Sequence, residues 1–251
     1  MTALRHSLIL AVALLVAGAM IAGSIFFGFE RLSSDTVTAI QARAALEPVP
    51  SKEPESKPAA EPEPAVDVAN VSFDGVPFIG DPAAQAVMAY WYDYQCPYCH
   101  EVELEVMPRL IADYVETGKL RIYFKDYQFL GPDSKAAALA GRAVWEVAPD
   151  RFYEWHRAVF ERQDEENGGW GSTDDIVALT KTIAGIDSDR VEALLSTKAD
   201  AYEQAIEDDL AEAGGMGING TPGTIIGSQL LSGARPYAQF KVAVDAALRS
   251  K

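Results

Sequence analysis

The chain has 251 residues, a formal net charge of −16 and only two cysteines. Such an acidic chain lacks the basic face that phosphate binding requires, which excludes nucleic acid as a partner. Two cysteines are too few for a disulfide framework, and the hydrophobic fraction of 49% leaves enough apolar residues for one domain with a sizeable core.

The N-terminal segment contains an apolar run from Leu8 to Phe29, with no charge between Arg5 and Glu30. A run of this length can cross a bilayer as a helix. Arg5 precedes it, which favours a cytoplasmic N-terminus. We therefore predict that residues 1–30 are a signal anchor, which would make the protein membrane-anchored with the remainder on the extracytoplasmic (periplasmic or cell-surface) side. The alternative is cleavage of a signal peptide, followed by secretion.

Residues 31–69 have the composition of a linker. Proline recurs between Pro48 and Pro64 among glutamate, alanine, serine and lysine. A segment of this kind cannot bury a core and tends to be extended. We predict a Pro/Glu/Ala-rich linker here, followed by one folded domain over residues 70–251.

The two cysteines lie in the motif Cys96-Pro97-Tyr98-Cys99, directly after the apolar run 86–92. The run predicts a buried strand, and the pattern after the motif predicts a helix from Pro97 to about residue 116. Cys96 would then lie at a helix N-terminus, where free N–H groups and the helix dipole stabilise a thiolate. These residues predict a reversible disulfide in which Cys96 is the nucleophile and Cys99 resolves.

Three other readings of the motif remain open. A structural disulfide would gain little because the loop is short, and a zinc site would need further ligands. The string Cys96-x-x-Cys99-His100 also fits covalent attachment of a c-type haem, which would make the protein an electron carrier in a mostly helical domain. The strand predicted before the motif argues against haem.

The remaining elements follow in the order strand, helices, hairpin and helix. Residues 120–124 predict a second strand, parallel to the first because a helix connects the two. Pro108 is expected to kink or break that helix. A short strand or hairpin is suggested at residues 71–73 and 78–79, and an almost wholly helical insertion at residues 133–215. A hairpin is expected at residues 223–226 and 229–231, and a closing amphipathic helix at residues 235–249.

The segments Tyr94–Cys99 and Gly220-Thr221-Pro222-Gly223, in this order of elements, resemble the DsbA-like branch of the thioredoxin superfamily. The resemblance covers essentially all of residues 70–251. It implies an α/β fold: a thioredoxin fold with an inserted helical subdomain, here preceded by the predicted N-terminal transmembrane helix. It also implies that Pro222 is cis beside the cysteines and that the residue at Thr221 pairs with a substrate strand.

The resemblance implies a thiol–disulfide oxidoreductase that introduces disulfides into reduced exported client proteins. Pro97 and Tyr98 would tune the Cys96–Cys99 pair, a quinone-linked membrane protein would reoxidise it, and no cofactor or metal would be needed. The alternatives are a disulfide isomerase or reductase of the same fold and a non-catalytic binding domain.

The sequence departs from many relatives at one position. They carry a buried acid six residues before the nucleophile, where this chain has Tyr90. Asp93 is the nearest acid on the N-terminal side, and Lys125 would have been the partner of the missing acid. His100 and Glu101 also lie near the motif, but their positions are equally typical of exposed helix residues. The group that transfers the proton therefore stays unassigned.

Overall fold

The computed structural model describes residues 66–250. The predicted signal anchor and nearly all of the predicted linker lie outside these residues. Within the described part of the chain, no helix is both long and apolar enough to span a bilayer. The first described residue, Val66, lies within the predicted linker and is buried, and a short 3-10 turn, η1 (Val68–Asn70), follows it.

A five-stranded sheet forms the centre of the domain, in the order β1-β3-β2-β4-β5. The two central strands, β2 and β3, are parallel, as the helix that connects them requires, and the other pairs are antiparallel. In the register, Tyr90 lies opposite Phe124 on one side and Thr224 on the other. The strands are β1 (Phe78–Ile79), β2 (Ala86–Tyr92), β3 (Leu120–Asp126), β4 (Gly223–Ile226) and β5 (Gln229–Ser232).

The connection between β2 and β3 is helical from Pro97 to Val115. It consists of α2 (Pro97–Glu101), η2 (Val102–Val106), α3 (Met107–Leu110) and η3 (Ile111–Val115), where η2 and η3 are wider π-type turns. Of the two outcomes expected at Pro108, a complete break does not occur, but the helix is locally distorted directly before it, where Val106 has a φ of −102°. The chain remains helical through this proline, because a wide turn before it accommodates a residue without an N–H.

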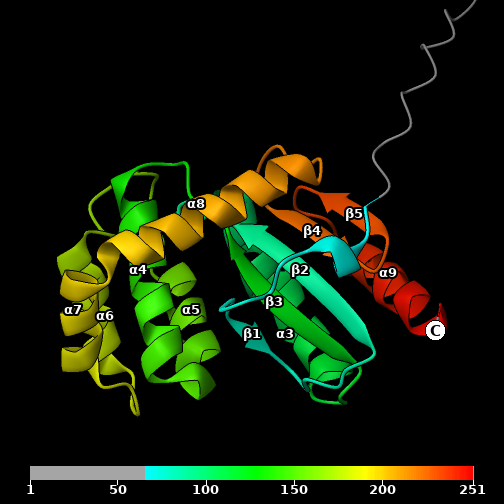
Figure 1. Cartoon of the computed structure of the whole chain (residues 1–251), viewed down its shortest axis with the longest axis horizontal. Helices are drawn as coiled ribbons and strands as arrows, with labels where there is room; N and C mark the ends of the chain where they lie inside the picture. The colour runs from blue at the N-terminus through cyan, green and yellow to red at the C-terminus, as the bar shows by residue number, and fades with distance from the viewer. Residues whose placement is uncertain (1–65, 251) are drawn as a thin grey trace, which may run out of the picture. The chain divides into compact units, whose positions relative to one another are not determined.

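The segment between β3 and β4 is a helical subdomain, beside the sheet in Figure 1. Its last helix, α8, returns to the sheet and packs on β3. The helices are α4 (Pro132–Val147), η4 (Pro149–Arg151), α5 (Phe152–Glu161), α6 (Thr173–Thr182), α7 (Ser188–Thr197) and α8 (Ala199–Gly215). This confirms the predicted helical insertion, and the first helix begins at Pro132 because proline is well suited to the first turn.

The core is divided between the two faces of the sheet. Alternate side chains of β2 point to opposite faces of the sheet. Met88, Tyr90 and Tyr92 pack with the helical connection Pro97–Val115, with α9 (Tyr237–Arg249) and with the helical subdomain. Ala89 and Trp91 pack on the other face, in a smaller cluster with residues of α8 and the N-terminal segment. The fold is a thioredoxin-like α/β fold with a helical insertion, as predicted, although residues 71–73 form no strand.

Candidate active site

Both cysteines lie at the junction between β2 and α2. Cys96 is the residue that caps α2, with extended backbone angles (φ −76°, ψ 119°), and Pro97 takes the first helical position. Both thiols are free. Cys96 retains 4% of its surface, whereas Cys99, one turn further along the helix, is fully buried. A reagent from solvent therefore meets Cys96 first.

The two thiols differ sharply in acidity. The Cys99 thiol, Thr221 and the backbone N–H groups of the first helical turn hold the pKa of Cys96 at about 6, against the opposing effect of burial. Burial, together with the neighbouring Cys96, raises the pKa of Cys99 well above its usual value. The pair is thus divided into a stabilised thiolate at Cys96 and a protonated thiol at Cys99.

The loop before β4 meets the cysteines from the other side. The Thr221–Pro222 peptide bond is cis, and the Thr221 carbonyl oxygen lies 3.5 Å from the Cys96 Sγ, which donates to it. The Thr221 side chain also lowers the pKa of both cysteines. Two segments that are 125 residues apart in sequence are therefore joined at one site.

The two residues between the cysteines face solvent. Pro97 is exposed, and Tyr98 keeps 62% of its surface accessible. The Tyr98 backbone N–H nevertheless helps to lower the pKa of Cys96. The exposed Tyr98 ring is placed to contact whatever approaches Cys96.

Asp93, the acid nearest to the motif on its N-terminal side, has a structural role. One carboxylate oxygen accepts from the Gln95 N–H at 2.8 Å and from the Ser134 hydroxyl, and the other accepts from the N–H groups of Phe129 (2.8 Å) and Leu130 (3.0 Å). Both oxygens are thus occupied by donors that fix the loops around the motif, which makes Asp93 poorly suited to move a proton.

Residues of the 161–167 loop, which looks solvated in sequence, also hold the motif. The Gln163 side-chain amide donates to the carbonyl oxygens of Tyr94 (2.7 Å) and Cys96 (3.2 Å). The Asn167 N–H donates to the Gln95 side-chain oxygen at 2.8 Å. The helical subdomain therefore helps to set the backbone conformation at the nucleophile.

Behind Cys99 lies a group of buried polar side chains that sequence reasoning missed. Glu103 follows Cys99 by four residues, on the same helical face, and is fully buried. One Glu103 oxygen lies 3.2 Å from His156 Nε2, and His156 Nδ1 lies 2.9 Å from the Tyr94 hydroxyl. The other Glu103 oxygen and the hydroxyls of Tyr90 and Tyr153 are buried without a hydrogen bond of ordinary geometry.

His100, Glu101 and Lys125 do not lie in this buried group. His100 Nδ1 lies 3.0 Å from the Phe160 carbonyl oxygen, so the ring packs against α5, while Glu101 is exposed. Lys125 is buried in ion pairs with Asp209 and Glu212. The sequence signal that points to Glu103 instead is its spacing from Cys99, because helical residues four apart share a face.

The fold and the paired thiols define a protein of the thioredoxin type. A family model described as thioredoxin matches residues 73–246, which is most of the chain. The chain therefore belongs to the thioredoxin family, and it is a DsbA-like thiol:disulfide oxidoreductase.

Named relatives support this assignment. Disulfide bond formation protein D of Bacillus subtilis is 26% identical over 180 residues, which span 72% of this chain and 80% of that protein. The crystal structure of oxidised BdbD from Bacillus subtilis matches with a TM-score of 0.65 and 24% identity, over 71% of this chain and 96% of that one. The crystal structure of the thiol-disulfide exchange protein alpha-DsbA2 of Wolbachia pipientis matches with a TM-score of 0.60 and 27% identity, over 68% of this chain and 86% of that one.

Proposed function

We propose that this protein introduces disulfides into reduced exported proteins through the Cys96–Cys99 pair. The observation that carries the proposal is the position of Cys96 at the N-terminus of α2, beside the buried Cys99 and the cis Thr221–Pro222 bond, which lowers the pKa of Cys96 to about 6. A stabilised Cys96 thiolate favours the reduced form of the pair, so the disulfide form is a strong oxidant. The name of the Bacillus relative, a disulfide bond formation protein, supports the same direction.

The reaction proceeds by two exchanges. A client thiolate attacks the Cys96 sulfur, the Cys96–Cys99 bond breaks, and Cys99 leaves and takes up a proton. A second client thiolate then attacks the client sulfur of the mixed disulfide, and Cys96 leaves as a thiolate. Two client thiols are oxidised and the cysteine pair is reduced by two electrons.

The surroundings of Cys96 fit the approach of an extended client. The thiol contacts the cis Thr221–Pro222 loop, which leads into β4, and the exposed Tyr98 follows two residues after it. We assign Thr221 and Pro222 to client binding and Pro97 and Tyr98 to tuning of the pair. A thioredoxin-like sheet also differs from the mostly helical domain expected for haem attachment, which weighs against the electron-carrier alternative.

The proposed setting is the extracytoplasmic side of a membrane. It rests on the apolar run Leu8–Phe29 and the preceding Arg5, which predict an anchor for the catalytic domain. A quinone-linked membrane protein would then reoxidise the pair after each turnover. Carbonate extraction of membranes from cells that make the full chain tests the anchor: the full chain should stay in the pellet, and a chain without residues 1–30 should not.

The decisive experiment is the redox equilibrium of the full chain against a glutathione series, with free thiols trapped and counted by mass spectrometry. We expect a potential at or above about −180 mV, well above the roughly −270 mV of thioredoxin. A value near that of thioredoxin would overturn the oxidase and favour the reductase. The Cys96→Ser and Cys99→Ser variants are controls, because neither can form the intramolecular disulfide.

A further inference from the structure

Cys99 must change its protonation state in every exchange, and it does so without access to water. It is fully buried, and burial raises the pKa of its thiol, so neither loss nor uptake of a proton is possible directly from solvent. Asp93 is occupied by four donors, and position 90 carries a tyrosine in place of the usual acid. A different group has to exchange the proton.

Tyr90 and Cys99 belong to one buried core cluster, and Glu103, four residues after Cys99, is fully buried as well. Tyr90 is fully buried on β2, beneath the helix that carries both other residues. Burial, then Cys99, then Glu103 raise the pKa of Tyr90, which shows that the thiol and the carboxylate both act on this hydroxyl. The Tyr90 hydroxyl and one Glu103 oxygen are both buried without a hydrogen bond of ordinary geometry.

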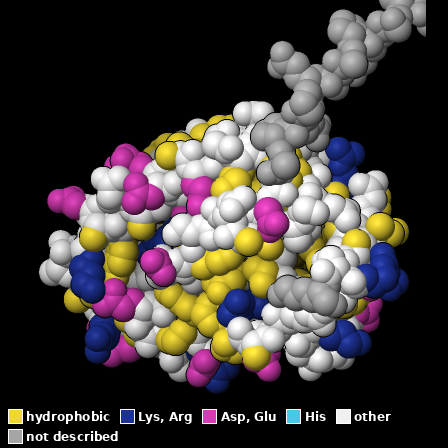
Figure 2. Space-filling model, turned by 45° about the vertical axis from the view of Figure 1, so that its right-hand side comes forward, with side chains coloured by type: hydrophobic (Ala, Val, Ile, Leu, Met, Phe, Trp, Pro, Cys, Tyr) yellow, Lys and Arg dark blue, Asp and Glu magenta, His cyan; other side chains and the backbone are white. Residues whose placement is uncertain are grey.

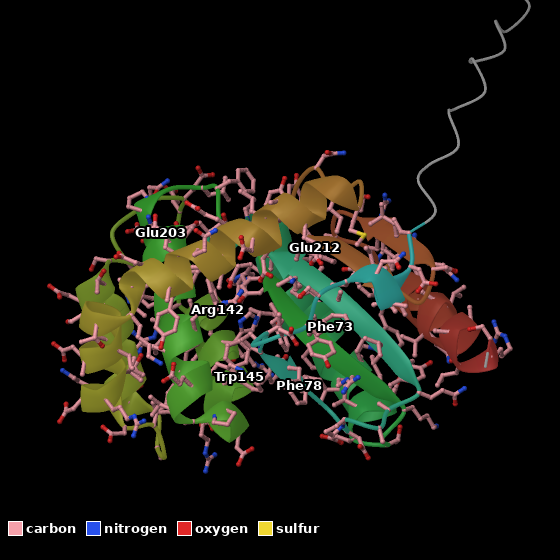
Figure 3. All side chains as sticks on the ribbon, viewed as in Figure 1. Phe73, Phe78, Arg142, Trp145, Glu203 and Glu212 are labelled. Carbon is pink, nitrogen blue, oxygen red and sulfur yellow. The ribbon has the colours of Figure 1, made fainter. Side chains whose placement is uncertain are left out.

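Glu103 also leads away from the thiols. Burial and then Glu103 raise the pKa of Tyr153, a half-buried residue of α5. Tyr153 lines a surface pocket together with Phe78 and Trp145, whose rings lie 5.3 Å apart and are labelled in Figure 3. Tyr153 thus extends the group of buried polar side chains near Cys99 toward this pocket.

His156 fixes the carboxylate in this position. Its ring is enclosed by aromatic side chains, with ring centroids 4.7 Å from both Tyr92 and Phe124. In one tautomer of the neutral ring, Nε2–H donates to Glu103 and Nδ1 accepts from the Tyr94 hydroxyl, which satisfies both nitrogens. One Glu103 oxygen is then held by His156, and the other stays available.

We propose that Tyr90 and Glu103 form the proton-transfer path of Cys99, with Tyr153 connecting Glu103 to the surface pocket beside Phe78. When Cys99 attacks a mixed disulfide at Cys96, its proton passes to the Tyr90 oxygen while the Tyr90 proton passes to Glu103. The Cys96–Cys99 bond forms, the bond to the partner sulfur breaks, and the partner leaves as a thiolate. In the opposite direction Glu103 returns the proton through Tyr90 to the departing Cys99.

Among the described residues, five titratable groups lie near Glu103 or interact with it, and each can be varied separately. They are Cys99 on its own helix, Tyr90 from β2, Tyr153 and His156 from α5, and Tyr94 from the loop after β2. Glu105, two residues further along the helix, is exposed and serves as the matched control.

The test rests on the exchange chemistry proposed above and uses glutathione as the probe. Cys96 of the full chain is loaded with glutathione, and loss of the mixed disulfide by attack of Cys99 is followed from pH 5 to 8 by acid quench and mass spectrometry. We expect Glu103→Gln and Tyr90→Phe each to slow this step by about tenfold or more and to alter its pH profile. The double variant should be no slower than the slower single variant, because both act in one path.

The controls separate this path from a structural effect and from the proposed function. Glu105→Gln should keep the wild-type rate, and the midpoint of Cys96 ionisation, read as thiolate absorbance, should stay near 6 in all variants. Wild-type rates and pH profiles in both Glu103→Gln and Tyr90→Phe would overturn the path while leaving the function intact. A wild-type chain that does not exchange with glutathione would overturn both. Tyr153→Phe tests the proposed connection between Glu103 and the surface pocket. That connection is wrong if this variant loses the mixed disulfide as fast as wild type.

Discussion

The buried polar side chains form two groups that differ in how well they are paired. The charge cluster consists of Lys125, Asp126, Arg142, Asp209 and Glu212, and the thiol-side cluster of Tyr90, Glu103, Tyr153 and His156. In the charge cluster every charge has a partner of opposite sign, as in the 2.7 Å contact between Arg142 Nε and Asp126. In the thiol-side cluster three oxygens have neither an ordinary hydrogen bond nor an ion pair, whereas the one such oxygen of the charge cluster, Glu212 Oε2, lies 2.9 Å from Lys125 Nζ.

This difference indicates that the two clusters are retained for different reasons. A buried group without a partner destabilises a fold, so such groups persist mainly where they serve a reaction. The charge cluster instead joins α4 and α8 to β3, as Arg142 and Glu212 in Figure 3 illustrate. Mutations should therefore affect stability in the charge cluster and exchange rate in the thiol-side cluster.

The largest effect is expected from Asp209→Asn. This substitution leaves Lys125 and Arg142 buried with less compensating charge, which should lower the free energy of unfolding by about 3–5 kcal/mol. Urea unfolding of the two proteins measures the difference. Asp208→Asn, at an exposed neighbouring position, is the control and should change little. If the folded Asp209→Asn variant also lost glutathione exchange, the division between the clusters would be wrong.

The stability of the reduced protein should also depend on pH, and this dependence should come from Cys96 and not from the charge cluster. The pKa of Cys96 is depressed to about 6 in the folded state, so its stabilising effect is fully present above the unfolded pKa and is lost as pH falls through 6. Reduced protein should therefore gain stability relative to the disulfide form between pH 6 and pH 9. Alkylation of Cys96 by iodoacetamide should be half-maximal near pH 6.

Paired urea unfolding curves at pH 5, 7 and 9 measure the first effect. In Cys96→Ser the pH-dependent gain should disappear. A reduced protein whose stability fell over this range would contradict the assigned sign.

A smaller effect is expected from Tyr90→Phe on stability. The substitution removes a buried hydroxyl that lacks an ordinary hydrogen bond, so the free energy of unfolding should stay within about 1 kcal/mol of wild type or rise. Thermal and urea unfolding measure it, alongside the exchange rate, which should fall. A loss of several kcal/mol would show that the hydroxyl is structural and that the two clusters do not differ in kind.

The smallest effect should come from an exposed ion pair on α5. Arg157 Nε lies 2.8 Å from Glu161, with side-chain exposures of 42% and 51%, so solvent screens the interaction. Glu161→Gln should change the free energy of unfolding by about 0.3–0.5 kcal/mol, read from the urea midpoint. A change as large as that of Asp209→Asn would mean that burial is not what separates strong from weak pairs here.

The sequence predicted the strand 86–92 and the placement of Cys96 well, because a continuous apolar run and a proline at the first helical position are strong local signals. Glu103 was overlooked although its spacing from Cys99 was visible, since Glu101, Glu103 and Glu105 alternate like exposed residues. His156 was equally readable, because it lies four residues from Phe152 and Phe160 on the buried face of α5.

Other contacts could not be read from the chain at all. The pairing of Lys125 with Asp209, and of Gln163 with the Cys96 carbonyl oxygen, joins residues that lie tens of positions apart. Local pattern carries no information on which loop returns to which strand. Figure 2 shows one face of the surface, where Lys and Arg lie among Asp and Glu around a central apolar area.

The way the chain enters the domain has a mechanical consequence. The Val68 N–H donates to the Gly227 carbonyl oxygen at 2.7 Å, at the opposite end of β4 from Thr221 and Pro222. Further on, the Ser72 N–H donates to Glu212, and its carbonyl oxygen accepts from Lys125. A force applied to the chain before Val66 is thus borne first by these contacts, so pulling loads the far end of the sheet before any strain reaches Cys96.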